Sequence, residues 1–252
     1  MSKPRILLLD IETSPDLVWT WGVYEQNAIE VLEHWKVLSF SAEWYGGKQI
    51  TKGLNDYKGY KPSGTDEEIC RDIWRLLNEA DIVIAHNGLK FDIRKLNARF
   101  IAHGFDPPSE YKVVDTAREV RRVAAFSSNK LDWLCKQLEL GHKLEHEGWP
   151  LWRACIGGDK KAWAKMKKYN RHDVTLMKKL YKLLQPWIKQ PNMGAWVEGI
   201  VCTNPACGST KLTKQGFKIN KTRRYQQYKC QICGSWSRSV KSEKQSAKAV
   251  GV

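Results

Sequence analysis

Two carboxylates, Asp10 and Glu12, end an apolar run that begins near Leu7. If this run forms a β-strand, side chains two residues apart point to the same face of the sheet, so the two acids lie side by side. Neighbouring carboxylates repel each other unless a positive charge offsets them. Hard divalent cations such as Mg²⁺ and Mn²⁺ bind carboxylate oxygens, and the pair therefore predicts a metal-ion site at the end of this strand.

Two further acids occur downstream in settings that suit the same site. Asp92 follows a predicted strand and a glycine-containing turn, which places it on the first turn of a helix near the edge of the sheet. Asp173 lies four residues after Tyr169, so the two side chains share one face of a later helix. Each acid also has a structural explanation, because Asp92 can stabilise a helix N-terminus and Asp173 can belong to a solvated helix face.

Two other side chains compete for these roles. Asp115 also ends a predicted strand and is the leading alternative metal ligand, although we expect it to support the site rather than bind the ion. His172 is an alternative general base, but it adjoins Asp173 on the helix and therefore points about 100° away from it.

Hydrophobic periodicity indicates the elements that must position these residues. Buried or alternating apolar runs predict strands, and Gly46-Gly47 predicts a tight turn between two of them. The predicted strands cover residues 5–11, 17–24, 37–45, 48–51, 81–85 and 112–114. The predicted helices cover residues 65–77, 90–103, 131–140 and 159–185, the last with an interruption near residues 168–169. This order is typical of an α/β domain with a mixed sheet.

Four of the seven cysteines form two closely spaced pairs, Cys202-x4-Cys207 and Cys230-x2-Cys233, and a glycine follows each pair. The arrangement resembles a zinc ribbon, in which four thiolates bind one structural Zn²⁺ in tetrahedral geometry. The alternative is four reduced or disulfide-linked cysteines. The other three lie in apolar-patterned segments, where we expect them to be buried: Cys70, Cys135 and Cys155.

Positive charge is concentrated in the last part of the 252-residue chain, whose net charge is +15. Residues 201–252 hold 11 Lys and Arg and one acid (+10), whereas residues 1–200 hold 31 basic and 26 acidic residues (+5). A polyanion, most simply nucleic acid, is the expected partner. Because no apolar run approaches the ~20 residues of a membrane span and no signal peptide precedes the first strand, we expect a cytoplasmic protein without membrane attachment.

Three motifs in this order carry a family resemblance. The acid-x-acid pair of the first strand, Asn87-x4-Asp92 and Tyr169-x3-Asp173 resemble the three exonuclease motifs of the DEDD superfamily, in its tyrosine-containing branch. That branch is related to the proofreading domains of family A and family B DNA polymerases. The resemblance covers about residues 5–185, and residues 129–135 resemble the helix that precedes the last motif.

The resemblance implies an RNase H-like fold, with a mixed sheet of five or six strands flanked by helices, and two Mg²⁺ or Mn²⁺ ions in the active site. Tyr169 would orient the attacking water in a 3′→5′ exonuclease reaction that releases nucleoside 5′-monophosphates. The residues that would hold the ions are Asp10, Glu12, Asp92 and Asp173.

The same resemblance suggests how substrate binds. Asn87 and Phe91 match family positions near the terminal nucleotide. DNA is favoured, as single strands or 3′ ends, and RNA is possible. The zinc ribbon would grip the substrate through basic and aromatic side chains, namely Lys218, Lys221, Arg223, Arg224 and Tyr225. Two other functions stay open, a non-catalytic nucleic-acid-binding protein and an RNase H-like endonuclease.

The expected domain organisation follows from these assignments. Residues 1–190 form the exonuclease domain, residues 191–200 a linker, residues 201–240 the zinc ribbon and residues 241–252 a disordered tail. The ribbon is too short to fold on a core of its own, so its Zn²⁺ ion would supply much of its stability.

Overall fold

A computed structural model describes residues 3–24, 27–189, 191–220 and 223–243. The chain divides into two compact units, one of Arg5–Leu180 and one of Tyr181–Val252 with Met1–Pro4. Two sequence predictions fall outside the described residues: the contact assigned to Lys221 and most of the predicted tail, residues 244–252.

The larger unit is built on a five-stranded mixed sheet in the order β5-β4-β1-β6-β7, which confirms the predicted mixed sheet. The central strand, β1, pairs antiparallel with β4 and parallel with β6. Its residues Leu7, Leu8 and Leu9 are almost fully buried, because both faces of a central strand are covered. The strands are β1 Ile6–Thr13, β4 Val37–Trp44, β5 Gln49–Gly53, β6 Ile82–Ala85 and β7 Lys112–Asp115.

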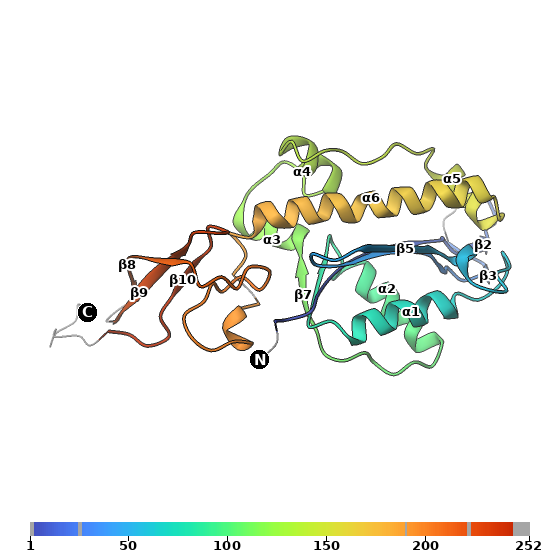
Figure 1. Cartoon of the computed structure of the whole chain (residues 1–252). Helices are drawn as coiled ribbons and strands as arrows, with labels where there is room; N and C mark the ends of the chain where they lie inside the picture. Colours follow the sequence, from blue (N-terminus) through green and yellow to red (C-terminus); the bar gives the residue numbers. More distant parts are fainter. Residues whose placement is uncertain (1–2, 25–26, 190, 221–222, 244–252) are drawn as a thin grey trace. The chain divides into compact units, whose positions relative to one another are not determined.

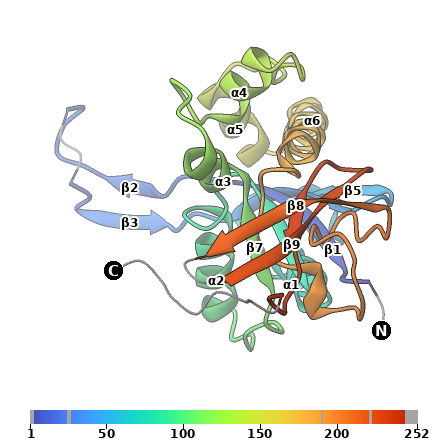
Figure 2. The same ribbon diagram turned by 90° about the vertical axis from the view of Figure 1, so that its left-hand side faces the viewer.

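The strand predicted over residues 17–24 is shorter than expected and does not join this sheet. Leu17–Trp19 (β2) pairs only with Glu30–Glu33 (β3), in a two-stranded hairpin whose side chains are largely exposed. Figure 2 shows this hairpin extending away from the five-stranded sheet. An alternating aromatic and apolar pattern favours a strand wherever it pairs, so the sequence could not distinguish local pairing from pairing in the core.

Helices cover both faces of the main sheet (Figure 1), with α6 on one face and α1 and α2 on the other. α6 spans Lys160–Leu184 without a break, so the predicted interruption near residues 168–169 is wrong. α1 covers Glu67–Asn78 and α2 covers Asp92–Ala102. The core between these layers includes the fully buried Trp163 of α6.

Shorter helices complete the larger unit. α4 (Leu131–Gln137) matches a predicted helix, whereas α3 (Thr116–Val123) and α5 (Trp149–Ile156) were not predicted. A single 3₁₀ turn, η1, covers Leu54–Asp56. In the described part of the chain, no helix combines the length and the apolar content that a membrane span requires.

The smaller unit contains an antiparallel three-stranded sheet in the order β10-β9-β8, preceded by a 3₁₀ turn, η2. Gly208 and Gly234 each follow a cysteine pair and have φ of +55° and +74°, a conformation that glycine adopts without strain. These two turns bend the chain around the four cysteine sulfur atoms. The elements are η2 Met193–Ala195, β8 Leu212–Asn220, β9 Arg223–Cys230 and β10 Trp236–Arg238.

A buried ion pair joins the helices below the sheet. Asp66, the residue before α1, is fully buried, and its carboxylate accepts hydrogen bonds from Arg99 Nε of α2 (2.9 Å) and from the backbone N–H of Val37 (2.8 Å). His103 Nε2 lies 2.7 Å from the same carboxylate. Burial disfavours the charge, but these partners together keep the pKa of Asp66 below its usual value.

Arg99→Met tests how much this ion pair contributes to the free energy of unfolding. The substitution keeps an apolar stem but leaves Asp66 buried without its guanidinium, so we expect the free energy of unfolding in urea to fall by about 3–5 kcal/mol. Arg75→Met is the matched control, because the Arg75 side chain is 63% exposed and its ion pair with Asp72 is 3.5 Å long. The control should change stability by less than about 1 kcal/mol. Equal effects of the two substitutions would contradict this assignment.

Candidate active site

Three of the predicted acids converge although they are far apart in the sequence. β1 supplies Asp10 and Glu12 from the same face, and α6 supplies Asp173. One carboxylate oxygen from each lies within 4.8 Å of the others. The Asp173 carboxylate is buried, and within the described residues its Oδ1 atom has no hydrogen-bond partner. A buried oxygen of this kind is suited to a cation, so the three residues could hold a divalent metal ion.

Asp92 lies next to this group but outside the 4.8 Å cluster. It is the first residue of α2, is almost fully buried, and accepts a hydrogen bond from the backbone N–H of Ile11 through Oδ1 (3.1 Å). Its negative charge is, after burial, the largest cause of the raised pKa of Asp10. The fourth predicted ligand is therefore electrostatically part of the site, with one oxygen engaged by the backbone of β1.

The loop before α2 is tightly packed and brings Asp92 to this position. A Cβ atom on Gly88 would lie only 2.3 Å from Cβ of Ala85, so any larger residue would force the loop to shift. Asn87 has φ of +64°, which is uncommon for a residue other than glycine.

Asp115, the alternative ligand, holds this loop from the other side. Its carboxylate accepts four backbone N–H groups, from Asn87 (2.9 Å), Leu89 (3.2 Å), Ala117 (3.1 Å) and Arg118 (3.2 Å). It caps the N-terminus of α3 and fixes the turn that leads to α2. Such a carboxylate has little capacity left for a metal ion, which agrees with the supporting role expected for it.

The electrostatics of the cluster indicate a shortage of positive charge. Burial and the neighbouring acids raise the pKa of Asp10 well above its usual value. Burial, together with Asp173 and Asp92, raises the pKa of Glu12 to about 8 although Lys143 opposes the shift. Burial also raises the pKa of Asp92 to about 7 and that of Asp173. Divalent cations would relieve this repulsion, so the donor set fits hard metal ions.

Lys143 is a site residue that was not predicted from the sequence. Its Nζ donates hydrogen bonds to Asp173 Oδ2 (2.5 Å) and to the Tyr169 hydroxyl (2.8 Å), and its backbone N–H donates to Asp132 Oδ1 (2.7 Å). Burial opposes the charge, but Asp173 and Tyr169 raise the pKa of Lys143. It is therefore a cation at neutral pH. The residue lies in a loop without periodicity, and only its charge could have drawn attention to it.

Tyr169 lies one helical turn before Asp173, as predicted. Its ring packs edge-on against His146 (centroids 4.7 Å apart) and near Trp152 (6.2 Å). Burial and the charge of Asp173 raise the pKa of its hydroxyl, which therefore stays protonated at neutral pH. The ring contacts fix where this hydroxyl can lie.

Asn170 is a second residue that the sequence did not reveal. Its side chain is fully buried, and its Nδ2 donates a hydrogen bond to Asp10 Oδ2 (2.6 Å). This contact orients the Asp10 carboxylate from α6. By contrast, His172 lies 2.8 Å from the backbone oxygen of His142 through Nε2, so the structure gives it a partner away from the acids.

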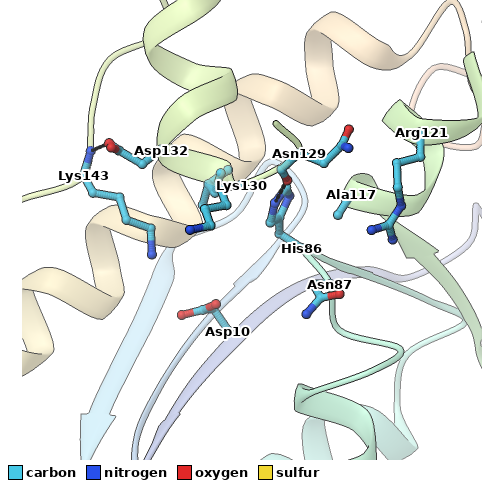
Figure 3. A pocket seen from close by; sticks show the side chains of 10 residues that line it. Asp10, His86, Asn87, Ala117, Arg121, Asn129, Lys130, Asp132 and Lys143 are labelled. Carbon is cyan, nitrogen blue, oxygen red and sulfur yellow. Dashed lines mark hydrogen bonds between the residues drawn. The ribbon is translucent and has the colours of Figure 1, made fainter. Parts of the chain in front are cut away.

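An open hollow of about 610 Å³ begins at the acid cluster (Figure 3). Asp10 and Asn87 lie at one side of it, and Arg121, Lys130 and Lys143 contribute positive charge to its wall. The hollow thus combines acidic and basic groups, as a site for a metal-bound phosphate requires.

His86 lies in the wall of the hollow, and Phe91 lies just before α2. His86 bridges Thr116 Oγ1 and the backbone oxygen of Asn129, each at 2.9 Å, and burial lowers its pKa to about 4, so it is a neutral part of the wall. Phe91, predicted to lie near the terminal nucleotide, immediately precedes α2 and is 39% exposed. The substrate-binding roles of Phe91 and Asn87 stay predictions.

The four paired cysteines also converge. One sulfur atom from each lies within 4.8 Å of the others, with Sγ–Sγ distances of 3.4 Å between Cys202 and Cys233 and 3.8 Å between Cys207 and Cys230. These distances exclude disulfide bonds, and all four thiols are free. Sulfur atoms at the corners of a Zn²⁺ tetrahedron lie about this far apart, so the cluster fits a zinc ribbon.

The chain belongs to the RNase H superfamily, whose family model matches residues 7–185. This membership and the observed sheet confirm the RNase H-like fold predicted from the sequence.

Two DNA polymerases are similar to parts of this chain. A DNA polymerase III PolC-type from Ureaplasma parvum serovar 3 is 27% identical over 117 residues, which cover 46% of this chain and 8% of that polymerase. The family B DNA polymerase from the hyperthermophilic archaeon Pyrobaculum calidifontis has a similar fold, with a TM-score of 0.55, 12% identity and coverage of 89% of this chain and 32% of that chain. The chain thus spans about a third or less of the length of either polymerase.

The raised pKa values predict how pH and Mg²⁺ act together on stability. Between about pH 4 and pH 8 the folded, metal-free protein binds more protons than the unfolded chain. In the folded protein the pKa is about 8 for Glu12 and about 7 for Asp92. In the unfolded chain the same groups have pKa values of ~4.3 and ~3.9. The free energy of unfolding without Mg²⁺ should therefore fall as pH rises through this range. Mg²⁺ offsets the repulsion, so the Tm gain from Mg²⁺ should increase by several degrees towards pH 8.

Scanning fluorimetry with and without added Mg²⁺ at a series of pH values measures this effect. Asp10→Asn is the matched control, because it removes one charge from the cluster with little change of shape and should reduce the Mg²⁺ gain at every pH. A Tm gain that stays constant with pH, or that is undiminished in Asp10→Asn, would be inconsistent with Mg²⁺ binding by these carboxylates.

Proposed function

We propose that this chain is a metal-dependent 3′→5′ exonuclease that releases nucleoside 5′-monophosphates from nucleic acid. The observation that supports the proposal best is the convergence of Asp10, Glu12 and Asp173 within 4.8 Å, with Tyr169 one helical turn from Asp173. An acid cluster beside an oriented tyrosine and a basic hollow is suited to hydrolysis of a phosphodiester bond.

Two Mg²⁺ or Mn²⁺ ions would be held by four carboxylates, those of Asp10, Glu12, Asp92 and Asp173. When bound, such ions make a water molecule more acidic and stabilise the attacking and leaving oxygens of an in-line displacement. Asn170 keeps the Asp10 carboxylate in place through its hydrogen bond from α6.

The remaining steps depend on side chains of the protein. The Tyr169 hydroxyl stays protonated, so it orients the attacking water by hydrogen bonding instead of removing its proton. Lys143 lies beside both Tyr169 and Asp173 and adds positive charge where the reacting phosphate gains negative charge. Arg121 and Lys130 line the same hollow and would neutralise phosphates of the bound strand.

DNA is the favoured substrate, because the two similar proteins described above are DNA polymerases by name. A single strand or a free 3′ end suits an open hollow of this size, and RNA is an alternative that the same chemistry would accept. A nucleic-acid substrate and four free thiols that fit a structural Zn²⁺ agree with an intracellular protein. We further propose that the basic ribbon holds the substrate while the acid cluster performs the chemistry.

Asp10→Ala tests the proposed activity. The substitution removes a metal ligand, so cleavage of an oligonucleotide with Mg²⁺ should fall at least about a thousandfold, which corresponds to a loss of several kcal/mol of transition-state stabilisation. Asp106→Ala, which removes an exposed acid that belongs to none of the three motifs, should leave the rate unchanged. Full activity of Asp10→Ala would exclude the assignment.

The same assay, with oligonucleotides labelled at either end, distinguishes the proposed reaction from its alternatives. Stepwise shortening from the 3′ end supports the exonuclease. Internal cuts would identify an RNase H-like endonuclease, and a mobility shift without cleavage would identify a non-catalytic binding protein.

Tyr169→Phe separates water positioning from metal binding. The ring contacts with His146 and Trp152 are retained and only the hydroxyl is lost, so kcat should fall by about 10- to 100-fold. The Mg²⁺ concentration that gives half-maximal activity should stay the same, because Tyr169 is not a ligand. Steady-state kinetics at several Mg²⁺ concentrations measures both quantities. A higher Mg²⁺ concentration for half-maximal activity in Tyr169→Phe would argue against a positioning role.

A further inference from the structure

The two faces of the ribbon sheet differ in chemistry. Residues that pair across neighbouring antiparallel strands share a face, as do residues two apart on one strand. Lys218 pairs with Tyr225, and Trp236 pairs with Lys229. One face, called here the stacking face, therefore contains two aromatic and four cationic side chains, namely Tyr225, Trp236, Lys218, Arg223, Lys229 and Arg238.

The aromatic and cationic side chains of the stacking face alternate in space. The Arg238 guanidinium carbon lies 4.1 Å from the centre of the Tyr225 ring, and Lys229 Nζ lies 5.8 Å from the centre of the Trp236 ring. Trp236 is 48% exposed, although a ring of this size is normally covered in a soluble protein. Each ring thus has a positive charge beside it; the Trp236 ring is exposed, whereas Tyr225 is half-buried with the Arg238 guanidinium over its ring.

The opposite face of the ribbon sheet contains the small core of the ribbon and an internal ion pair. Towards the cysteine cluster it contains the buried residues Tyr228 and Cys230, which form the small core of the ribbon. Towards the other end, Arg224 packs over the Phe217 ring (4.6 Å) and forms an ion pair with Glu243 (2.9 Å). Arg224, which the sequence analysis assigned to the substrate, therefore lies on this face with its charge already offset.

The charges of the stacking face indicate which kind of ligand it binds. Glu243 is the one acid in residues 201–252, and it pairs with Arg224 of the opposite face. Four cations without an acid among them favour a polyanion, and the exposed Trp236 ring between them favours planar bases over a plain phosphate surface. A basic sheet that carries aromatic rings is a surface on which about two or three unstacked bases can lie.

We propose that the stacking face binds single-stranded nucleic acid, with bases stacked on Trp236 and Tyr225 and phosphates neutralised by the neighbouring cations. Bases in a duplex are already stacked and paired, so they cannot reach the rings. The face therefore selects single strands over duplexes, and it feeds a single-stranded 3′ end to the acid cluster. This last consequence rests on the exonuclease activity proposed above, whereas the binding preference does not.

The test uses the full chain carrying Asp10→Ala, so that the probe is not degraded, and measures fluorescence anisotropy of a labelled oligothymidylate and of a duplex of equal length. The single strand should bind at least about tenfold more tightly than the duplex. Adding Trp236→Ala should weaken single-strand binding by about 10- to 100-fold and leave duplex binding nearly unchanged. Phe217→Ala, a matched removal of an exposed ring from the opposite face, should change neither by more than about twofold.

Two further measurements guard against an unfolded ribbon. Bound zinc should stay at one ion per chain in Trp236→Ala, and Trp236→Phe, which keeps a ring, should recover most of the single-strand affinity. The double variant Lys218→Gln with Arg223→Gln should reduce the slope of log affinity against log salt by about 1 to 2, because two phosphate contacts are lost. Equal affinity for duplex and single strand, or unchanged binding by zinc-loaded Trp236→Ala, would overturn the proposal.

A small substrate separates this inference from the proposed function. Hydrolysis of the p-nitrophenyl ester of thymidine 5′-monophosphate needs the acid cluster but offers no strand to the ribbon. It should be lost in Asp10→Ala and be unchanged in Trp236→Ala. If no hydrolysis occurs while the single-strand preference persists, the exonuclease assignment fails and the stacking face stands; the reverse result rejects the stacking face alone.

Discussion

The mutual repulsion of buried carboxylates is the constraint on which the larger unit depends. The central strand β1 fixes Asp10 and Glu12, and packing of α6 against the sheet brings Asp173 to within 4.8 Å of them. Burial, and after it the repulsion between these acids, raises their pKa values, and the apolar core holds the carboxylates together against this cost. Asn170 and Lys143 offset part of this cost, and divalent ions would remove most of the rest. An acid cluster with more negative than positive charge is suited to divalent cations.

Much of the fold and the main acids could be predicted from the sequence, because they depend on local patterns. An apolar run with alternating acids, a strand followed by a glycine turn, and a tyrosine one helical turn from an acid are all short-range features. Lys143 and Asn170 could not be found in this way. Asn170 meets Asp10 across 160 residues and Lys143 meets Asp173 from an irregular loop, so neither contact leaves a periodic signal. The exposed β2–β3 hairpin was misjudged for a related reason, since a strand pattern does not identify its partner.

Asp92 and Asp115 show that hydrogen-bond capacity, more than position, separates a candidate ligand from a structural residue. Both acids follow neighbouring strands near the hollow. Asp115 accepts four backbone N–H groups, so its oxygens are used in holding the loop at Asn87 and the start of α3. Asp92 accepts fewer such bonds, from Ile11 through Oδ1 and from its own backbone N–H, and so keeps more capacity for an ion. The family resemblance ranks Asp92 above Asp115 as a metal ligand, and this ranking stays a prediction that the difference in hydrogen bonding favours.

The uneven distribution of charge follows from the same constraint. Cations close to the acid cluster would compete with divalent ions for the carboxylates, and Lys143 already occupies one such position. A nuclease nevertheless needs positive charge to bind a polyanion. In this chain +10 of the net +15 lies in residues 201–252, in a unit that has its own sheet and its own candidate metal site. In the proposed function these cations bind phosphates, and the covalent connection between the units raises the local concentration of substrate for the acids. The proposal thus assigns polyanion binding mainly to the smaller unit and binding of divalent ions to the carboxylates of the larger unit.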